Sequence, residues 1–139
     1  MKRVKKTAKI HLKRISFSAV EKRPRRIVED RGELAILHPM GPVYNPCYFD
    51  LHPGSSLFRG SHYHRSKTEV FYVISGLCLV RYVDVATGED GLIQAQSGDM
   101  ITIMPMCAHR MEAVKFCQGI EFSLEDVDYE ADTTAYKFD

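Results

Sequence analysis

The 139-residue chain contains no tryptophan and no apolar run that approaches the roughly 18 residues of a membrane-spanning helix. Its first residues are positively charged, but the apolar segment that completes a secretory signal does not follow them. We therefore expect no membrane span and a cytoplasmic location. Internal repeats and low-complexity tracts are also lacking, which argues against repeat architectures. The length suits one domain with a real core.

The four cysteines have no CxxC spacing, and each lies in or beside an apolar run: Cys47, Cys78, Cys107 and Cys117. Thiols in such surroundings are usually small buried hydrophobic side chains, and a reducing cytosol suits all four. Cys107 is the candidate for a further role, because it lies two residues before His109.

The net charge of +1 hides a strong asymmetry. Residues 1–26 contain eleven Lys or Arg and one Glu, a balance of +10, so the remainder carries −9. A basic arm can bind nucleic acid, but apolar residues alternate with polar ones between Ile10 and Phe17, which favours a strand with one apolar face. We expect this arm to pack on the barrel or to cross to the second subunit of a homodimer, with residues 8–20 as the added strand. Nucleic acid is the less favoured partner.

From Ile27 the chain alternates short apolar strands with Gly and Pro turns. Strands are predicted at 47–51, 70–74, 77–85, 92–95 and 100–104, and turns at 53–56, 75–76 and 87–91. The strands at 77–85 and 92–95 should form a hairpin. No stretch before Ser123 has apolar residues at the spacing of an amphipathic helix. The pattern predicts an all-β sandwich or barrel over 27–122, preceded by the arm at 1–26 and followed by an acidic tail at 123–139 that complements the arm in charge.

Residues 60–76 contain three candidate metal-binding residues, His62, His64 and Glu69, in the spacing His-x-His-x4-Glu. Residues two apart in a strand point to one face, so both imidazoles can converge while Glu69 opens the next strand opposite them. His109, which follows a turn, a strand and a proline, offers a fourth ligand. Three nitrogens and a carboxylate suit a divalent metal, whether Zn, Fe, Mn or Ni. A metal-free pocket in which these groups only hydrogen-bond is the alternative.

These segments resemble the two motifs of the cupin superfamily, Gly-x5-His-x-His-x3-4-Glu-x6-Gly and Gly-x5-Pro-x-Gly-x2-His-x3-Asn. The resemblance covers about residues 50–115 and assigns the metal ligands to His62, His64, Glu69 and His109. Met106 replaces the glycine of the second motif and Ala113 its asparagine, but no ligand is lost. The resemblance implies a jelly-roll β-barrel of two antiparallel sheets, with a pocket open at one end.

Residues 29–34 and 59–64 further resemble the small cupins of bacterial surface-polysaccharide pathways. These include the cupin part of capsular-polysaccharide enzymes, the deoxysugar-nucleotide 3,5-epimerases and the 3,4-ketoisomerases. The resemblance implies an epimerase or isomerase that moves a proton next to the ketone of a sugar nucleotide. Two alternatives stay open, so enzymatic turnover is itself undecided. One is a metal-dependent dioxygenase with the same ligands, and the other is a non-catalytic cupin that binds a sugar or small effector.

The implied reaction needs a proton-transfer group and cationic partners for a diphosphate. The candidates for proton transfer near the motif are Asp50, His52, Lys67 and Tyr72, and Tyr48 is a further titratable neighbour. The candidates for the diphosphate are Arg59, Arg65 and Arg110, which flank the predicted ligands.

Overall fold

The computed structural model describes residues 7–15, 25–37 and 41–139, and these form ten strands and one short helix. The strands are β1 Ile10–Arg14, β2 Arg25–Glu29, β3 Gly32–Ile36, β4 Tyr44–Leu51, β5 Phe58–His64, β6 Glu69–Asp84, β7 Asp90–Gln96, β8 Asp99–Ile103, β9 Cys107–Ser123 and β10 Thr133–Ala135, and the helix is α1 Tyr129–Asp132. All pairs of these strands are antiparallel, which confirms the all-β prediction. No helix in the described part of the chain is long and apolar enough to cross a membrane.

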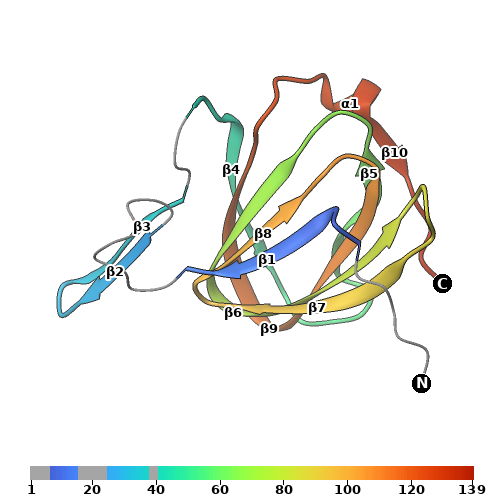
Figure 1. Cartoon of the computed structure of the whole chain (residues 1–139). Helices are drawn as coiled ribbons and strands as arrows, with labels where there is room; N and C mark the ends of the chain where they lie inside the picture. Colours follow the sequence, from blue (N-terminus) through green and yellow to red (C-terminus); the bar gives the residue numbers. More distant parts are fainter. Residues whose placement is uncertain (1–6, 16–24, 38–40) are drawn as a thin grey trace.

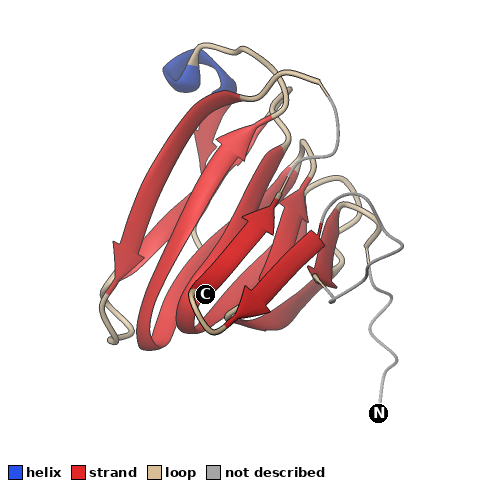
Figure 2. Ribbon diagram, turned by 90° about the vertical axis from the view of Figure 1, so that its left-hand side faces the viewer, coloured by secondary structure: helices blue, strands red, loops and turns tan. Residues whose placement is uncertain are grey.

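Two long strands, β6 and β9, close the barrel because each changes partners along its length. The first half of β6 pairs with β8 and its second half with β7, while β9 pairs with β5 and then with β4. β6 and β9 also pair with each other. Figure 1 shows the remaining barrel strands wrapped around this pair, and Figure 2 shows the curvature of the resulting layers.

The turn predicted at 75–76 is wrong, because β6 runs through Ser75 and Gly76 as one strand. The register between β6 and β9 shifts on either side of Ser75, which marks a β-bulge. Gly76 has φ +92°, and a Cβ at this position would lie 2.1 Å from the Phe116 carbonyl oxygen. Glycine therefore permits a close crossing of two backbones and a bend of the strand, where the sequence suggested an end.

The other strand predictions in the barrel are confirmed to within a few residues. The second half of β6 and β7 form the expected hairpin, from Leu77 paired with Gln96 to Val83 paired with Asp90. Inward-facing side chains of β4, β6, β8 and β9 fill the core. Cys78, Cys107 and Cys117 are buried in it as expected, whereas Cys47 is exposed because it lies near the start of β4, at the open end of the barrel.

The described part of the arm packs on the barrel of its own chain. β1 pairs with β8, from Ile10 opposite Ile103 to Arg14 opposite Asp99, and Ile10 and Ile15 are buried. Residues 16–20 of the expected strand lie outside the described residues. Exchange of the arm with a second subunit stays a prediction.

β2 spans the expected boundary between arm and barrel, and it pairs with β3 in a separate two-stranded sheet. This hairpin projects from the side of the barrel in Figure 1, and its Glu33 accepts a hydrogen bond from Tyr72 of β6.

Three of the described cations of the arm pair with acids of the barrel and the β2–β3 hairpin. The ion pairs are Lys9 with Asp84 at 2.6 Å, Arg14 with Asp99 at 3.0 Å and Arg26 with Glu33 at 2.7 Å. Among the described residues, the acids of the C-terminal segment form no ion pair with the arm, and their charge complement to residues 1–6 and 16–24 lies outside the described residues. Strand β10 of this segment pairs with β5, and its carboxylates accept hydrogen bonds from the loop between β5 and β6.

Candidate functional site

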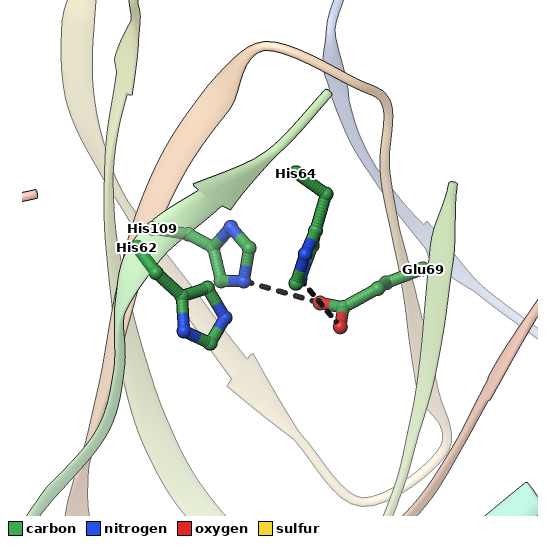
Figure 3. A group of neighbouring side chains, drawn as sticks. All are labelled: His62, His64, Glu69 and His109. Atoms are coloured by element: carbon green, nitrogen blue, oxygen red, sulfur yellow. Dashed lines mark ion pairs between the residues drawn. The ribbon is translucent and has the colours of Figure 1, made fainter. Parts of the chain in front are cut away.

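The four predicted ligands lie together on the inner face of the barrel. His62 and His64 come from β5, Glu69 opens β6 and His109 lies on β9 directly opposite His62. Their ligand atoms all lie within 4.8 Å of one another. Figure 3 shows the three imidazoles and the carboxylate pointing toward a common centre. His64, Glu69 and His109 are buried and His62 is half-buried, so the cluster is open to solvent mainly on the His62 side.

The Glu69 carboxylate lies between two imidazoles. Its Oε1 is 2.9 Å from His64 Nε2 and its Oε2 is 3.1 Å from His109 Nε2. These distances suit hydrogen bonds, but the directions do not, so three of these buried atoms have no hydrogen-bond partner among the described residues: His64 Nε2, Glu69 Oε2 and His109 Nε2. Buried polar atoms are rarely left in this state, and a cation among these converging atoms would satisfy all three.

The tautomer of His109 supports this interpretation. His109 Nδ1 lies 3.0 Å from the Cys107 carbonyl oxygen, which can only accept, so Nδ1 carries the proton. In the neutral ring the Nε2 lone pair then faces the Glu69 carboxylate, and two acceptors oppose each other. Either a second proton on the ring or a bound cation removes this repulsion. A histidine held through its other nitrogen by a backbone carbonyl is the usual arrangement of a metal ligand.

The protonation states of His62 and Glu69 also suit a metal. Burial, followed by the nearby His109 and His64, lowers the pKa of His62 to about 4, so its imidazole is neutral. Burial alone would raise the pKa of Glu69, but His109 and His64 together outweigh it and hold that pKa well below its ordinary value. Neutral imidazoles and an ionised carboxylate are the forms that bind metal ions. The residues present therefore fit a divalent metal.

The C-terminal segment supports the cluster from outside. Thr133 Oγ1 of β10 lies 3.1 Å from His64 Nδ1. The Asp132 carboxylate accepts from the backbone amides of Ser66 and Lys67, at 2.8 and 3.1 Å. Glu125 accepts from the Thr68 amide at 2.7 Å. The loop that joins two ligand-bearing strands is thus held by acids that the sequence suggested were partners of the arm.

A cavity of ≈ 750 Å³ opens in front of the cluster. His62, Glu69 and His109 line it together with apolar side chains such as Phe49, Phe71 and Met111. Its other polar side chains include Cys47, Tyr48, Arg59, Lys67, Glu121 and Tyr129. The cavity is large enough for a small organic ligand, whose apolar and polar parts would both find partners.

Among the predicted proton-transfer residues, Lys67 lines the cavity, with its Nζ 3.0 Å from Glu69 Oε1. The structure does not bring Asp50, His52 or Tyr72 into the lining. Asp50 accepts from the Tyr48 hydroxyl on the outer face of β4, and the exposed His52 ring packs on Phe116 at 5.1 Å between centroids. Tyr72 alternates with Phe71 on β6, so it points away from the cavity and donates to Glu33 of β3.

Of the three predicted diphosphate partners, Arg59 lines the cavity. Arg65 is exposed in the β5–β6 loop. Arg110 follows His109 and therefore faces outward, where it pairs with Glu112 and lies over the Phe58 ring at 4.7 Å. Strand alternation explains the placement of Arg110, because neighbours in a strand face opposite sides.

Sequence reasoning missed three cavity residues, Cys47, Glu121 and Tyr129. The Tyr129 ring lies 6.2 Å from the His62 ring and 5.3 Å from Lys67 Nζ. The C-terminal segment gave no local signal for this position. Glu121 had one, because it lies an even number of residues after His109 along the same strand and so shares its face.

The chain has a cupin jelly-roll fold, and comparison with known proteins identifies its family. Residues 29–120 match the polysaccharide biosynthesis C-terminal domain family, and the chain belongs to that family. A 41-residue stretch is 46% identical to a UDP-2-acetamido-2,6-beta-L-arabino-hexul-4-ose reductase of Pseudomonas aeruginosa. That stretch is 30% of this chain and 10% of the relative, so the chain matches only a small part of that protein.

Solved structures share the fold over most of the chain. A mutant of the 3,4-ketoisomerase QdtA from Thermoanaerobacterium thermosaccharolyticum, in complex with TDP-4-keto-6-deoxyglucose, superposes with a TM-score of 0.71 and 16% identity, over 93% of this chain and 88% of that one. The dTDP-4-dehydrorhamnose 3,5-epimerase of Sulfolobus tokodaii superposes with a TM-score of 0.67 and 17% identity, over 88% and 82%. At these identities the likeness concerns the fold.

Proposed function

We propose that this protein is a sugar-nucleotide isomerase or epimerase of polysaccharide biosynthesis that acts on a carbon next to a ketone. The observation that carries the proposal is the cavity, which presents Lys67 and the His/Glu cluster together on its wall. Family membership supports the pathway, and the structural relatives reported above include an isomerase and an epimerase. A dioxygenase and a non-catalytic binding module are not favoured by these relatives.

The chemistry requires a place for negative charge. Removing a proton next to a ketone leaves an enolate, whose oxygen must be stabilised by a positive group or hydrogen-bond donors. The Lys67 ammonium lines the cavity and is held by Glu69 at 3.0 Å, so it can donate a hydrogen bond to that oxygen. Lys67 is therefore the predicted candidate whose position suits the reaction, in the role of charge stabiliser.

The substrate class follows from the relatives and from Arg59. The names of two relatives describe a nucleotide-linked sugar with a ketone at position 4. We propose the same class here, a nucleotide-linked 4-keto-6-deoxy sugar. Arg59 Nε donates to the Asp50 carbonyl oxygen at 3.0 Å, which orients the guanidinium beside the cavity, where its Nη groups can donate to a diphosphate.

Deuterium exchange tests the reaction. The protein is incubated in deuterated water with TDP- and UDP-linked 4-keto-6-deoxy sugars, and deuterium next to the ketone is measured by NMR and mass spectrometry. We expect incorporation, slowed roughly 100-fold or more by Lys67→Met. Lys115→Met, at an exposed position on β9, serves as the control with unchanged exchange. Absence of exchange with every such sugar would contradict the proposal.

We also propose that His62, His64, Glu69 and His109 hold one divalent metal, with Zn, Fe, Mn and Ni as candidates. When bound there, it would supply Lewis-acid polarisation of the ketone oxygen. Elemental analysis of freshly purified protein should find close to one metal per chain. The double variant His62→Ala/His64→Ala should lose it while remaining folded by circular dichroism. His11→Ala/His52→Ala, outside the cluster, should retain it. A metal content near zero after incubation with Zn, Mn and Fe would contradict this proposal.

A further inference from the structure

A second carboxylate, Glu121, lines the cavity outside the metal cluster. It lies on β9 opposite Cys47 of β4 and opposite Phe71 of β6, so it is flanked by two strands of the inner face. The Cys47 thiol donates to Glu121 Oε1 at 2.9 Å. The assignments given above, to metal binding, charge stabilisation and the diphosphate, leave this side chain without a role.

The register places Glu121 close to the reacting end of the cavity. On the paired strands β6 and β9, Glu69 is opposite Ser123 and Phe71 is opposite Glu121. Glu121 and Glu69 are therefore diagonal neighbours on one face, within reach of each other across a small ligand. Lys67 Nζ lies 3.0 Å from Glu69 Oε1 on the same cavity wall. A substrate whose ketone oxygen meets Lys67 would present its neighbouring carbon toward Glu121.

We propose that Glu121 is the catalytic base that removes the substrate proton, and that Cys47 is a positioning residue that orients it. The proposal rests on the function proposed above. An ionised carboxylate only accepts hydrogen bonds, and here the thiol occupies Oε1, which leaves Oε2 to take a proton.

The surroundings of both residues suit these roles. Cys47 is exposed as a residue. Desolvation of its thiol by the surrounding cavity wall, together with the hydrogen bond to Glu121, nevertheless raises the pKa of the thiol to about 12, so the thiol stays protonated and donates. Tyr48 also borders the cavity, but its hydroxyl lies on the outer face of β4, where it accepts from Gln118 at 2.8 Å and donates to Asp50. Lys67 is paired with Glu69. Outside the proposed metal cluster, Glu121 is thus the carboxylate of the described lining that can accept a proton on Oε2.

The proton transfer balances without a co-reactant. The Glu121 carboxylate takes the proton from the carbon next to the ketone, and the electron pair of the broken C–H bond forms the carbon–carbon double bond of the enolate. The former ketone oxygen carries the negative charge beside Lys67. The ketone re-forms when a proton returns to carbon: return from the Glu121 carboxylic acid to the same face gives the exchange that the assay measures, and a proton delivered to the opposite face inverts the carbon. In deuterated water the acid exchanges before the return, which labels the sugar.

The test compares variants in the deuterium-exchange assay. Glu121→Gln keeps the size of the side chain and an acceptor for the thiol but removes the base, so exchange should fall roughly 100-fold or more. Its melting temperature and metal content should match those of the unchanged protein. Glu112→Gln, on the same strand but paired with Arg110 on the outer face, is the matched control and should exchange at the full rate. Glu121→Ala with added formate should recover exchange, because a free carboxylate can occupy the vacated space.

The outcomes separate the two proposals. No exchange by the unchanged protein overturns the proposed function and this inference with it. Full exchange by Glu121→Gln overturns this inference alone. If Glu121→Gln does not fold, the formate experiment decides, and an inactive Glu121→Ala that formate fails to rescue contradicts the role of base.

Cys47 is tested by rescue with a conservative replacement. Cys47→Ala removes the donor to Glu121 and should lower kcat about fivefold to tenfold with little change in KM. Cys47→Ser retains a donor at this position and should restore most of the rate. Equal rates for the Ala and Ser variants would exclude the positioning role.

Discussion

Replacing Asp132 with alanine should loosen the loop that joins His64 to Glu69. Asp132 is only 7% exposed, although it belongs to the C-terminal segment. Its two carboxylate oxygens accept from the amides of Ser66 at 2.8 Å and Lys67 at 3.1 Å. Its carbonyl oxygen also accepts from the Arg65 amide at 3.0 Å, a bond that alanine keeps. The substitution therefore removes two charge-assisted hydrogen bonds and leaves the backbone bond in place.

The structure sets the size of the effect. A hydrogen bond to a charged group contributes about 1.5–3 kcal/mol, so two would contribute about 3–6 kcal/mol if water could not reach either amide in the variant. Ser66 is exposed, and water can replace part of the loss at its amide. We therefore expect the free energy of unfolding to fall by about 2–3 kcal/mol. At roughly 3 °C per kcal/mol for a domain of this size, the melting temperature should drop by about 6–9 °C.

The same change should weaken metal binding, because the loop sets the separation of two ligand strands. Outer partners of metal ligands typically affect affinity about 10-fold to 100-fold. Thermal unfolding by circular dichroism and metal titration measure the two effects. Asp132→Asn keeps one acceptor oxygen and should fall between the alanine variant and the unchanged protein. Asp126→Ala, at an exposed position in the same segment, is the control. If Asp132→Ala melts within about 1 °C of the unchanged protein and binds metal equally, the segment does not support the site.

Three further predictions concern the barrel and its assembly. Chemical denaturation should show that Gly76→Ala lowers the free energy of unfolding by more than Gly88→Ala. Both glycines have positive φ, but only a Cβ at position 76 would meet backbone, 2.1 Å from the Phe116 oxygen. Equal losses would contradict the bulge argument. Burial would raise the pKa of Asp84, but hydrogen bonds from Lys9, Thr7 and two backbone amides outweigh it and lower that pKa from 3.8 to about 2. The ionised Asp84 therefore stabilises the folded protein fully above pH 3.8, and this contribution is lost as the pH falls through 2. Asp84→Asn should flatten the stability profile in that window, and an unchanged profile would refute the assignment. Light scattering should find a homodimer that deletion of residues 1–20 converts to monomer or aggregate, and a monodisperse full-length monomer would rule out the dimer.

The sequence by itself determined the class of fold and the four residues of the cluster. Short-range alternation indicated the all-β class and the shared face of His62 and His64, since a period of two decides which side chains share a face. The resemblance to the cupins selected the jelly roll and assigned His109 as the fourth ligand. His62 and His64 are two apart, Glu69 opens the next strand, and the structure brings them together with His109. The arm showed the same kind of signal, because the alternation from Ile10 onward corresponds to a real strand, β1.

Only the tertiary structure decided which of the other polar residues reach the cavity. Alternation separates the two faces of a strand, but it does not say which face is covered or by what. Lys67 lies within the His-x-His-x4-Glu motif and reaches the cavity, whereas Tyr72 follows the motif closely and Asp50 precedes it, and the strands of both turn their side chains outward. The support from Asp132 depends on pairing between β10 and β5, segments that lie far apart in the sequence. Such contacts are decided by the closure of the whole barrel, which no local pattern contains.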